Sequence, residues 1–289
     1  GLTLNNADSK LLLNSITLDS ASTSVNSLGI DVNADSKVTS LSVGHITPVS
    51  VAVNKLLYGE ITVTGGSLKL GDKGNILSSV QLSGGNLEST EAANIVGDIS
   101  ITQDANIETS NQKSLRYSGS TINLGSNTLT ISGLEFNNTS APILLDSADS
   151  RLILNDVSVN KVSTSADSLG IDADVTSKIT ELNVANITPL SISGGSGSCF
   201  GSSTFGTIIT VTAGSVKLDN TGCLASKLNM SGGILDVDET TTLNGALTQS
   251  GNITIDVATG KTLTYTGAAV SLGAKTLTLS GGGTLGNTN

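Results

Sequence analysis

The sequence predicts an all-β chain that folds as a right-handed parallel β-helix, or β-solenoid, with coils of about 14–20 residues. Three observations support this prediction. The composition suits short strands, a unit of about 145 residues occurs twice, and glycines recur within each unit at a shorter spacing. In a solenoid each coil stacks its strands on those of the previous coil. The right hand follows from the usual preference of parallel crossover connections.

The composition favours many short strands joined by small polar turns. Aromatic residues make up 2% of the chain, tryptophan is absent, and glycine occurs 33 times. The apolar residues are mostly Val, Ile, Leu and Ala, and β-branched side chains suit a stacked, pleated surface. Large rings would not fit a narrow core, so their scarcity agrees with a solenoid.

The charge balance argues against two classes of partner. A surface that binds nucleic acid or an anionic membrane needs a basic face, whereas this chain has 14 Lys and Arg and a net charge of −10. No apolar run is long enough to span a bilayer. We therefore expect neither a nucleic-acid partner nor a membrane span. Because the chain begins at Gly1 and stops within its repeat pattern, we expect it to be a segment of a longer protein.

The long repeat is visible by direct alignment. Residues 2–51 align with residues 143–192 without a gap, and 24 of the 50 positions are identical. After seven extra residues in the second copy, VTGGSLKL (63–70) matches VTAGSVKL (211–218). The sequence therefore predicts two solenoid units, residues 1–141 and 142–289.

A shorter spacing lies within each unit. Gly85 follows Gly66 at a spacing of about 19 residues, Gly233 follows Gly214 at the same spacing, and later glycines follow at intervals of 16 and 14. Such a period is too short for helical repeats and fits one coil of a parallel solenoid, which predicts roughly 16 coils. Glycine and asparagine would occupy the corners, where a positive φ is often needed. Two inward-facing aliphatic ladders are expected: Val63, Leu82 and Ile101, and Val211, Met230 and Leu247.

The two cysteines occur in the second copy alone. Cys199 lies in the seven-residue insertion, and Cys223 stands where the first copy has Asn75. Their separation in sequence corresponds to one coil plus the extra loop, which predicts a disulfide between neighbouring coils. A disulfide implies an oxidising, extracellular location. The alternative is two unpaired thiols, and two cysteines with one histidine do not make a convincing zinc site.

Clustered carboxylates raise the possibility of an enzyme. The densest group is Asp236, Asp238 and Glu239, and the matching stretch of the first copy holds Glu88 and Glu91. Paired carboxylates serve as acid and nucleophile in glycoside hydrolysis. However, the chain has only two arginines and few aromatic platforms for sugars. We expect a solvated face and no catalytic residues, and we keep a polysaccharide lyase or hydrolase as the alternative.

Two further residue sets have weaker chemical meaning. Asp31 and Asp35 lie in the same predicted corner as Asp172 and Asp174 of the second copy, and carboxylates in turns can bind Ca²⁺. Neither an EF-hand loop nor a glycine-rich calcium nonapeptide is present, so we expect no metal and no cofactor. His45 is the only histidine, the second copy has Asn186 in its place, and we expect a corner residue.

Outward threonines suggest a second alternative, an ice-binding solenoid. Such proteins present flat ladders of Thr-x-Thr, and this chain has Thr-x-Thr triplets that begin at Thr62, Thr128, Thr210, Thr262 and Thr276. Several other predicted coils carry Asp, Asn or Gln at the outward positions, so the ladder is interrupted. Threonine is also a good outward strand residue in general.

The coils VTGGSLKL, LSGGNLES and TLTISG resemble those of bacterial autotransporter passengers, filamentous-haemagglutinin-type adhesins and β-strand-repeat surface proteins. The resemblance covers essentially the whole chain and lies in the style of the coils. It implies export, display on the cell surface and a stiff stalk, and it implies no catalytic residues.

The expected function is therefore a structural and adhesive rod segment of a large extracellular surface or filament-forming protein. Its expected partners are its own tandem repeats or sister protomers stacked end to end, and a cell-surface or glycan ligand bound by loops such as residues 194–203.

Overall fold

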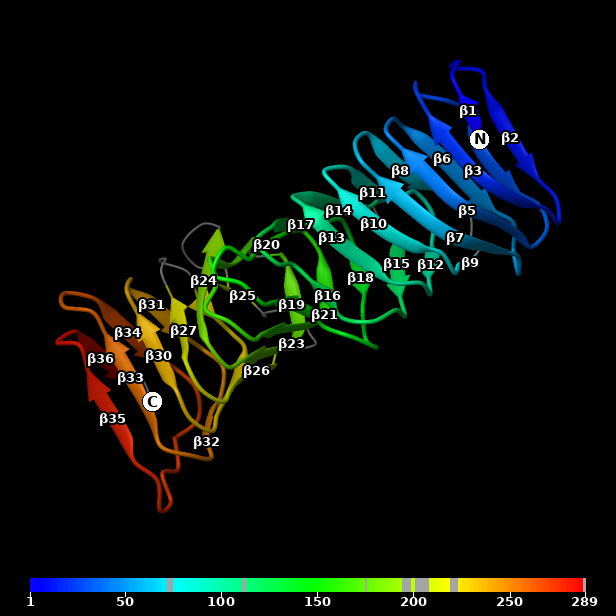
Figure 1. Cartoon of the computed structure of the whole chain (residues 1–289). Coiled ribbons are helices and arrows are strands. Elements are labelled where there is room, and N and C mark those ends of the chain that lie inside the picture. The colour runs from blue at the N-terminus through cyan, green and yellow to red at the C-terminus, as the bar shows by residue number, and fades with distance from the viewer. Residues whose placement is uncertain are drawn as a thin grey trace. The chain divides into compact units, whose positions relative to one another are not determined.

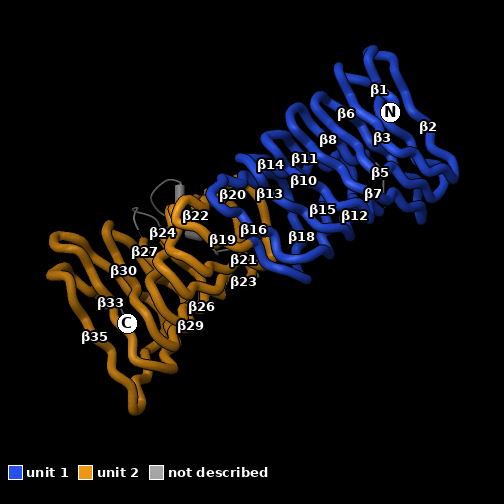
Figure 2. Tube along the Cα trace, viewed as in Figure 1, with its two compact units in different colours: residues 1–143 blue, residues 144–289 orange. Residues whose placement is uncertain are grey.

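The computed structural model describes residues 1–71, 75–110, 113–174, 176–193, 199–200, 208–218 and 223–287, and for residues 192–193, 199–200 and 287 it describes the backbone alone. The chain forms two compact units, Gly1–Ile143 and Leu144–Asn289 (Figure 2). The described residues contain no helix, and their parallel sheets stack as a β-solenoid of about 13 turns (Figure 1). The predicted all-β solenoid is thus confirmed.

We group the strands of each unit into three faces, A, B and C. In unit 1 the face C strands belong to the same hydrogen-bonded sheet as the face A strands, because Asn75 and Ile76 pair with Leu56 and Leu57. Coils at the start of a unit alternate a long face A strand with a shorter face B strand, and later coils add a face C strand. All strand pairings within the units are parallel, apart from one isolated antiparallel bridge between Ala258 and Gly282. Among the described residues no helix has the length and apolar character needed to cross a membrane.

In unit 1 the strands are distributed over the three faces as follows. Face A contains β1 (Leu2–Leu4), β3 (Thr17–Thr23), β5 (Ser36–Val43), β7 (Leu56–Val63), β10 (Ser79–Ser83), β13 (Ile99–Gln103) and β16 (Ile122–Asn123). Face B contains β2 (Lys10–Leu13), β4 (Gly29–Val32), β6 (Thr47–Val51), β8 (Ser67–Leu70), β11 (Asn86–Ser89), β14 (Ala105–Thr109) and β17 (Thr128–Ser132). Face C contains β9 (Asn75–Ile76), β12 (Ala93–Ile95), β15 (Ser114–Tyr117) and β18 (Glu135–Asn137).

Unit 2 repeats this arrangement, and β19 (Ile143–Leu145) spans the boundary in sequence. Face A contains β21 (Ser158–Thr164), β23 (Lys178–Val184), β26 (Ile208–Val211), β29 (Lys227–Met230) and β32 (Leu247–Gln249). Face B contains β20 (Arg151–Asn155), β22 (Gly170–Asp174), β24 (Ile187–Ser193), β27 (Ser215–Leu218), β30 (Ile234–Val237), β33 (Ile253–Val257) and β35 (Leu277–Ser280). Face C contains β25 (Cys199–Phe200), β28 (Cys223–Leu224), β31 (Thr241–Leu243), β34 (Thr262–Tyr265) and β36 (Thr284–Asn287).

The core consists of aliphatic ladders in which side chains of successive coils stack on one another. The predicted ladder of Val63, Leu82 and Ile101 is confirmed, because these residues pair in register and are buried. The second predicted ladder is wrong at its last position. Leu247 pairs with Leu228, and Met230 pairs with Gln249, because both pairs are one full coil apart and the prediction stopped two residues short of a coil.

Most coils have the length that the glycine spacing predicts, but several are longer. Leu68 lies opposite Leu87, whereas Ile107 lies opposite Ile131 and Glu181 opposite Ile208. The ladders stay in register across these longer coils. Longer coils explain why the chain makes about 13 turns and not the roughly 16 expected from the glycine intervals.

The recurring glycines occupy corners that require glycine. Gly66 has a φ of +59° and Gly214, at the same position of the second copy, has a φ of +63°. A Cβ atom at Gly66 would lie 2.5 Å from the carbonyl carbon of His45, and one at Gly214 would lie 2.4 Å from that of Asn186. Any other residue would therefore collide with the backbone of the preceding coil.

Candidate functional site

In the described part of the chain, six ion pairs join neighbouring coils, and four of them are counterparts, meaning residues at the same position of the two copies: Lys10–Asp31 with Arg151–Asp172, and Lys113–Glu91 with Lys261–Glu239. Lys217 is the counterpart of Lys69, but it pairs with Asp238, which stands two residues after the counterpart of Glu88. Near the start of each unit, Lys10 Nζ lies 2.5 Å from Asp31 Oδ2, and Arg151 Nη2 lies 2.5 Å from Asp172 Oδ2. Each pair lies on face B and links consecutive strands, β2 to β4 and β20 to β22.

The other four ion pairs lie further along each unit. Their N···O distances are 2.9 Å for Lys69–Glu88, 2.6 Å for Lys217–Asp238, 2.7 Å for Lys113–Glu91 and 2.6 Å for Lys261–Glu239. Each joins residues about one coil apart. The charged side chains of the repeat therefore cross-link coils along the axis of each unit.

Two members of the predicted carboxylate group, Asp236 and Asp238, interact with each other, whereas Glu239 is directed to another coil. Asp238 forms its ion pair with Lys217, and Glu239 forms its pair with Lys261 on the following coil. Asp236 is half-buried at the centre of β30, in register with Lys217 on one side and Asp256 on the other. The sequence analysis missed Lys217 and Asp256. The coil period could have revealed Asp256, because it lies one coil after Asp236 in the sequence.

Asp236 is a partly buried carboxyl group with other carboxyl groups beside it. Partial burial raises its pKa above the usual range, the charges of Asp238 and Asp256 raise it further, and Lys217 opposes them. Strand spacing of about 4.8 Å keeps the carboxyl groups of consecutive coils close together. A shallow groove on face B runs along Asp236 and Asp256, which lie in register on consecutive coils. It is lined by Ile187, Ile234, Asp236, Thr254, Asp256 and Ser280, with glycines and Ser215. Asp256 accepts a hydrogen bond from Ser280.

The counterpart of Asp236 in unit 1 is Glu88, and it is bonded differently. Lys69 Nζ donates to Glu88 Oε1 at 3.1 Å, and Ser67 Oγ donates to Glu88 Oε2 at 3.2 Å. Both oxygens of Glu88 therefore have a direct donor. The same position of the repeat is a satisfied ion pair in unit 1 and a crowded carboxyl group in unit 2.

The aspartates considered for calcium are bonded to protein groups. Asp31 and Asp172 pair with Lys10 and Arg151, as described above, and Asp35 Oδ1 accepts from the backbone N–H of Leu56 at 3.1 Å. Across the described part of the chain, no group of three or more His, Cys, Asp and Glu side chains is placed to hold a metal ion.

Asp174 lies in a corner that stabilises its ionised form. It accepts hydrogen bonds from the backbone N–H of Asp156 at 2.8 Å, from Thr176 Oγ1 at 2.9 Å and from the backbone N–H of Ser177 at 2.7 Å. Partial burial alone would raise its pKa, but these bonds, with the Ser177 hydroxyl, outweigh burial and lower the pKa.

The cysteine prediction is supported at the level of register. β25 pairs with β28 so that Cys199 lies opposite Cys223 on consecutive coils of face C. Cys223 is buried and disulfide-bonded, and there is no free cysteine in the described part. The side chain of Cys199 lies outside the described residues, so the Cys199–Cys223 bridge itself stays a prediction. Most of the proposed contact loop, residues 194–203, also lies outside them.

His45 and the outward threonines occupy the places that the pattern indicates, but the threonines rarely align. His45 is exposed at a corner. Thr62 pairs with Ser42 and Gln81, and Thr210 pairs with Asn183 and Asn229. In the described strands, the registers place threonine opposite threonine at Thr242–Thr264, Thr254–Thr278 and Thr262–Thr284. A long threonine ladder of the ice-binding kind is thus interrupted on these faces.

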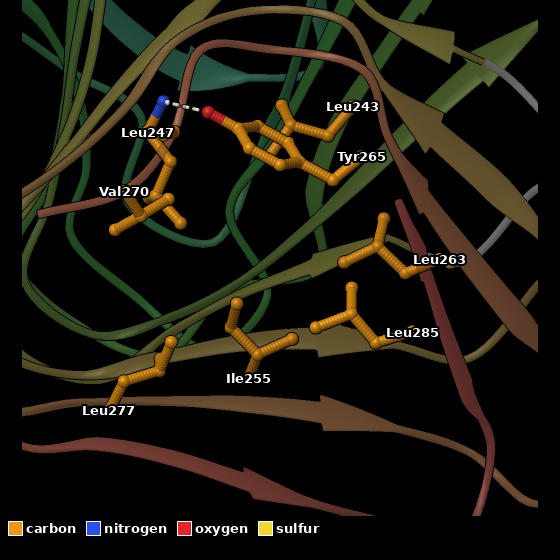
Figure 3. A pocket seen from close by; sticks show the side chains of 10 residues that line it. Leu243, Leu247, Ile255, Leu263, Tyr265, Val270, Leu277 and Leu285 are labelled. Carbon is orange, nitrogen blue, oxygen red and sulfur yellow. Dashed lines mark hydrogen bonds between the residues drawn. The ribbon is translucent and has the colours of Figure 1, made fainter. Parts of the chain in front are cut away.

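An apolar cavity of about 250 Å³ lies at the last coils of unit 2 (Figure 3). Tyr265 closes one side, where its hydroxyl accepts from the backbone N–H of Leu247 at 3.2 Å and donates to the carbonyl of Ala268 at 2.6 Å. Aliphatic side chains line most of the rest: Leu243, Leu247, Ile255, Leu263, Ala269, Val270, Leu277 and Leu285.

The matching region of unit 1 is filled. Tyr117 makes the same two hydrogen bonds, from the N–H of Ile99 at 3.1 Å and to the carbonyl of Ser120 at 2.7 Å. Its ring stacks on Phe136 with centroids 6.1 Å apart, and both rings are buried. By register, Leu285 takes the place of Phe136 in unit 2. The smaller side chain leaves space beside Tyr265.

In comparisons with known proteins, no family model, no curated protein and no solved structure matches the chain. The β-solenoid and its tandem-repeat character rest on the structure and the sequence of this chain alone.

Proposed function

We propose that the chain is a structural and adhesive segment of a large extracellular surface or filament-forming protein. The observation that carries this proposal is the set of coil-bridging ion pairs, of which Lys10–Asp31 and Lys113–Glu91 recur at the same repeat positions of unit 2. A repeat that uses charged residues to join one coil to the next is suited to a load-bearing scaffold. Lys10–Asp31 and its counterpart Arg151–Asp172 illustrate this use.

The mechanism is architectural. Parallel backbone hydrogen bonds and continuous aliphatic ladders join each coil to its neighbours, so that stability accumulates coil by coil along a unit. Further copies would lengthen the stack without changing its surface pattern. Corner loops, which vary in length while the ladders stay in register, would make any contact with a cell-surface or glycan ligand.

Two further points support an extracellular location. The disulfide at Cys223 agrees with an oxidising compartment, where such bonds persist. The coil style resembles that of bacterial autotransporter passengers and filamentous-haemagglutinin-type adhesins, which implies export and surface display. Secretion, adhesion and a bacterial origin are parts of this proposal.

Immunogold electron microscopy of intact source cells tests the proposed function. Antibodies raised against this chain should label stalks or fibres outside cells that have not been permeabilised. Preimmune serum and permeabilised cells serve as controls. Labelling confined to the cell interior, or native protein purified as compact soluble particles, would contradict the proposal.

A second candidate function, a polysaccharide lyase or hydrolase, has one observation in its favour. The face B groove of unit 2 contains Asp236, whose pKa is raised, together with Asp256 and, beside them, Lys217. A raised pKa makes a carboxyl group better suited to act as a general acid. Reducing-end and unsaturated-product assays on neutral and acidic polysaccharides test this candidate. Activity that Asp236→Asn abolishes and Glu88→Gln retains would support the enzyme.

A further inference from the structure

Face A of unit 1 carries an exposed aromatic ring on a strand. Tyr58 of β7 is 37% exposed, whereas Tyr117 and Phe136 are buried and Tyr265 is half-buried. β7 pairs with β5 on one side and with β9 and β10 on the other (Figure 1). The exposure of Tyr58 therefore comes from its outward direction on the face and does not depend on either end of the chain.

Two shallow grooves meet at this ring, and Lys37 and Tyr58 line both of them. The larger groove has a volume of about 560 Å³, which is within the range of sites that hold small ligands. Most of its other lining side chains carry a hydroxyl or carboxyl group: Thr39, Ser40, Glu60 and Ser79. The ring thus offers an apolar surface with hydrogen-bonding groups around it.

A β-bulge adds to the polar lining of the larger groove. The register between β5 and β7 shifts between Val38 and Ser40, so Thr39 has no partner on β7. Thr39 and Ser40 are both exposed, although adjacent residues of a regular strand face opposite sides. Ser40 pairs with Glu60. The bulge therefore places one more hydroxyl group on the outer surface beside this pair.

The scaffold does not use the charged groups of this surface. Lys37 is exposed and lies in register with Tyr58, and Glu60 is exposed two residues further along β7. Within the described residues, neither charged group forms an ion pair or a side-chain hydrogen bond, in contrast to the six ion pairs that bridge coils. All three side chains are free to contact a ligand.

Unit 2 has different residues at these positions. By register, Ile208 stands where unit 1 has Glu60. Two residues earlier, the sequence has Gly206 where unit 1 has Tyr58. The repeat therefore does not require the ring or the carboxylate, which indicates that they serve something other than the stacking of coils.

We propose that the surface around Tyr58 is a carbohydrate-binding site whose ligand is a neutral hexopyranose unit of a glycan. The ring of Tyr58 supplies a flat apolar surface on which the C–H face of a pyranose stacks. Glu60 accepts hydrogen bonds from sugar hydroxyl groups, and Lys37 donates to sugar oxygens. The hydroxyl groups of Thr39 and Ser40 donate or accept at the edge of the sugar.

The charges favour a neutral sugar over an acidic one. Glu60 and Asp35 lie in the two grooves with Lys37 as the single cation, and the chain carries a net charge of −10. This field repels a sugar that carries a carboxylate or sulfate group. The site supplies a ligand for the adhesive part of the proposed function and rests on that function. It belongs to strands of unit 1 and not to the corner loop of residues 194–203.

The test uses the purified chain on a printed array of neutral and acidic oligosaccharides, with lactose and cellobiose among the neutral ones. Isothermal titration with each sugar that binds gives its dissociation constant. Tyr58→Ala should weaken binding at least about ten-fold, whereas Tyr58→Phe keeps the ring and should retain most of the affinity. Glu60→Gln should weaken binding about five-fold, because the hydrogen bonds to a charged acceptor are lost.

Glu108→Gln and Arg116→Ala are the matched controls, because both residues are exposed on other faces of unit 1. They should bind as tightly as the wild type, and circular dichroism confirms that every variant is folded. A chain that binds no sugar on the array would overturn the proposal, and so would binding that Tyr58→Ala leaves unchanged. Binding confined to acidic sugars would overturn the assignment of a neutral ligand.

The two proposals fail in different ways. Surface labelling of source cells together with a purified chain that binds no sugar would remove this site and leave the scaffold function in place. Labelling confined to the cell interior, together with sugar binding that depends on Tyr58, would do the opposite.

Discussion

Two face B ladders at the same place in the repeat differ in their last position. In unit 1 the ladder is Leu68, Leu87, Ile107 and Ile131, and in unit 2 it is Val216, Leu235, Ile255 and Leu279. The first three positions are buried in both units, but Ile131 is buried and Leu279 is exposed. Both fourth residues are large and aliphatic. Residue type therefore makes a ladder position suitable for the core, and a neighbouring coil decides whether it is buried.

The aromatic position adds a difference in sequence to this difference in environment. Phe136 stacks on Tyr117 in unit 1, whereas Leu285 stands beside Tyr265 in unit 2 and an apolar cavity remains. The two tyrosines make equivalent hydrogen bonds. The matching coils therefore differ in packing: a stacked ring fills the space beside Tyr117, and a cavity remains beside Tyr265.

The largest expected effect comes from removing the ring. Phe136→Ala should lower the free energy of unfolding by about 3–5 kcal/mol, because it leaves a cavity against Tyr117 in a buried site. Leu285→Ala, at the matching position, should cost less than about 1 kcal/mol because Leu285 is already partly exposed. Urea unfolding followed by circular dichroism measures both. Equal losses would show that the two coils are packed alike.

Removing one hydroxyl group should give an intermediate effect. Tyr117→Phe leaves the N–H of Ile99 and the carbonyl of Ser120 without their partner in a buried site, at a cost of about 1–3 kcal/mol. Tyr265→Phe should cost about 0.5–1.5 kcal/mol, because water reaches the partly exposed counterpart. Thermal and urea unfolding should rank the two variants in this order. The reverse order would contradict this difference in packing.

The smallest effects should come from two aspartates of unit 2 whose pKa values move in opposite directions. The lowered pKa of Asp174 means that its ionised form stabilises the fold above pH 3.8, and this contribution is lost as the pH falls through the folded pKa. The raised pKa of Asp236 means that its protonated form contributes fully below pH 3.8, and this contribution is lost as the pH rises through the folded pKa.

Asparagine substitutions separate the two cases. At pH 7, Asp174→Asn should lower the free energy of unfolding by up to about 1 kcal/mol, and Asp236→Asn should leave it unchanged or raise it by a similar amount. The loss for Asp174→Asn should shrink below pH 3.8, and any gain for Asp236→Asn should disappear there. Stability of each variant and the wild type from about pH 3 to about pH 8 measures this. Changes of the same sign at pH 7 would contradict the assignment.

Much of the fold could be predicted because it rests on local pattern. Alternation along a strand placed Val63, Leu82 and Ile101 in one ladder, and the spacing of Gly66 and Gly85 gave the commonest coil length. The error at Leu247 has a physical reason. Alternation leaves a strand free to move by two residues, and only the neighbouring coil fixes its register.

The candidate sites were less predictable because they depend on which coils meet. The sequence grouped Asp236, Asp238 and Glu239. The fold keeps Asp236 beside Asp238, pairs Asp238 with Lys217 and Glu239 with Lys261, and adds Asp256 from the following coil. Residues adjacent in the chain alternate in direction, whereas residues one coil apart lie side by side.

By itself, the sequence determined the solenoid, its two copies, its commonest coil length and the aliphatic nature of its ladders, because these follow from strand alternation and repetition. The tertiary structure decided the lengths of individual coils, the partners of the charged groups and the contrast between the Phe136 and Leu285 coils. Those properties depend on side-chain volume and on contacts between residues of neighbouring coils, which no local pattern specifies.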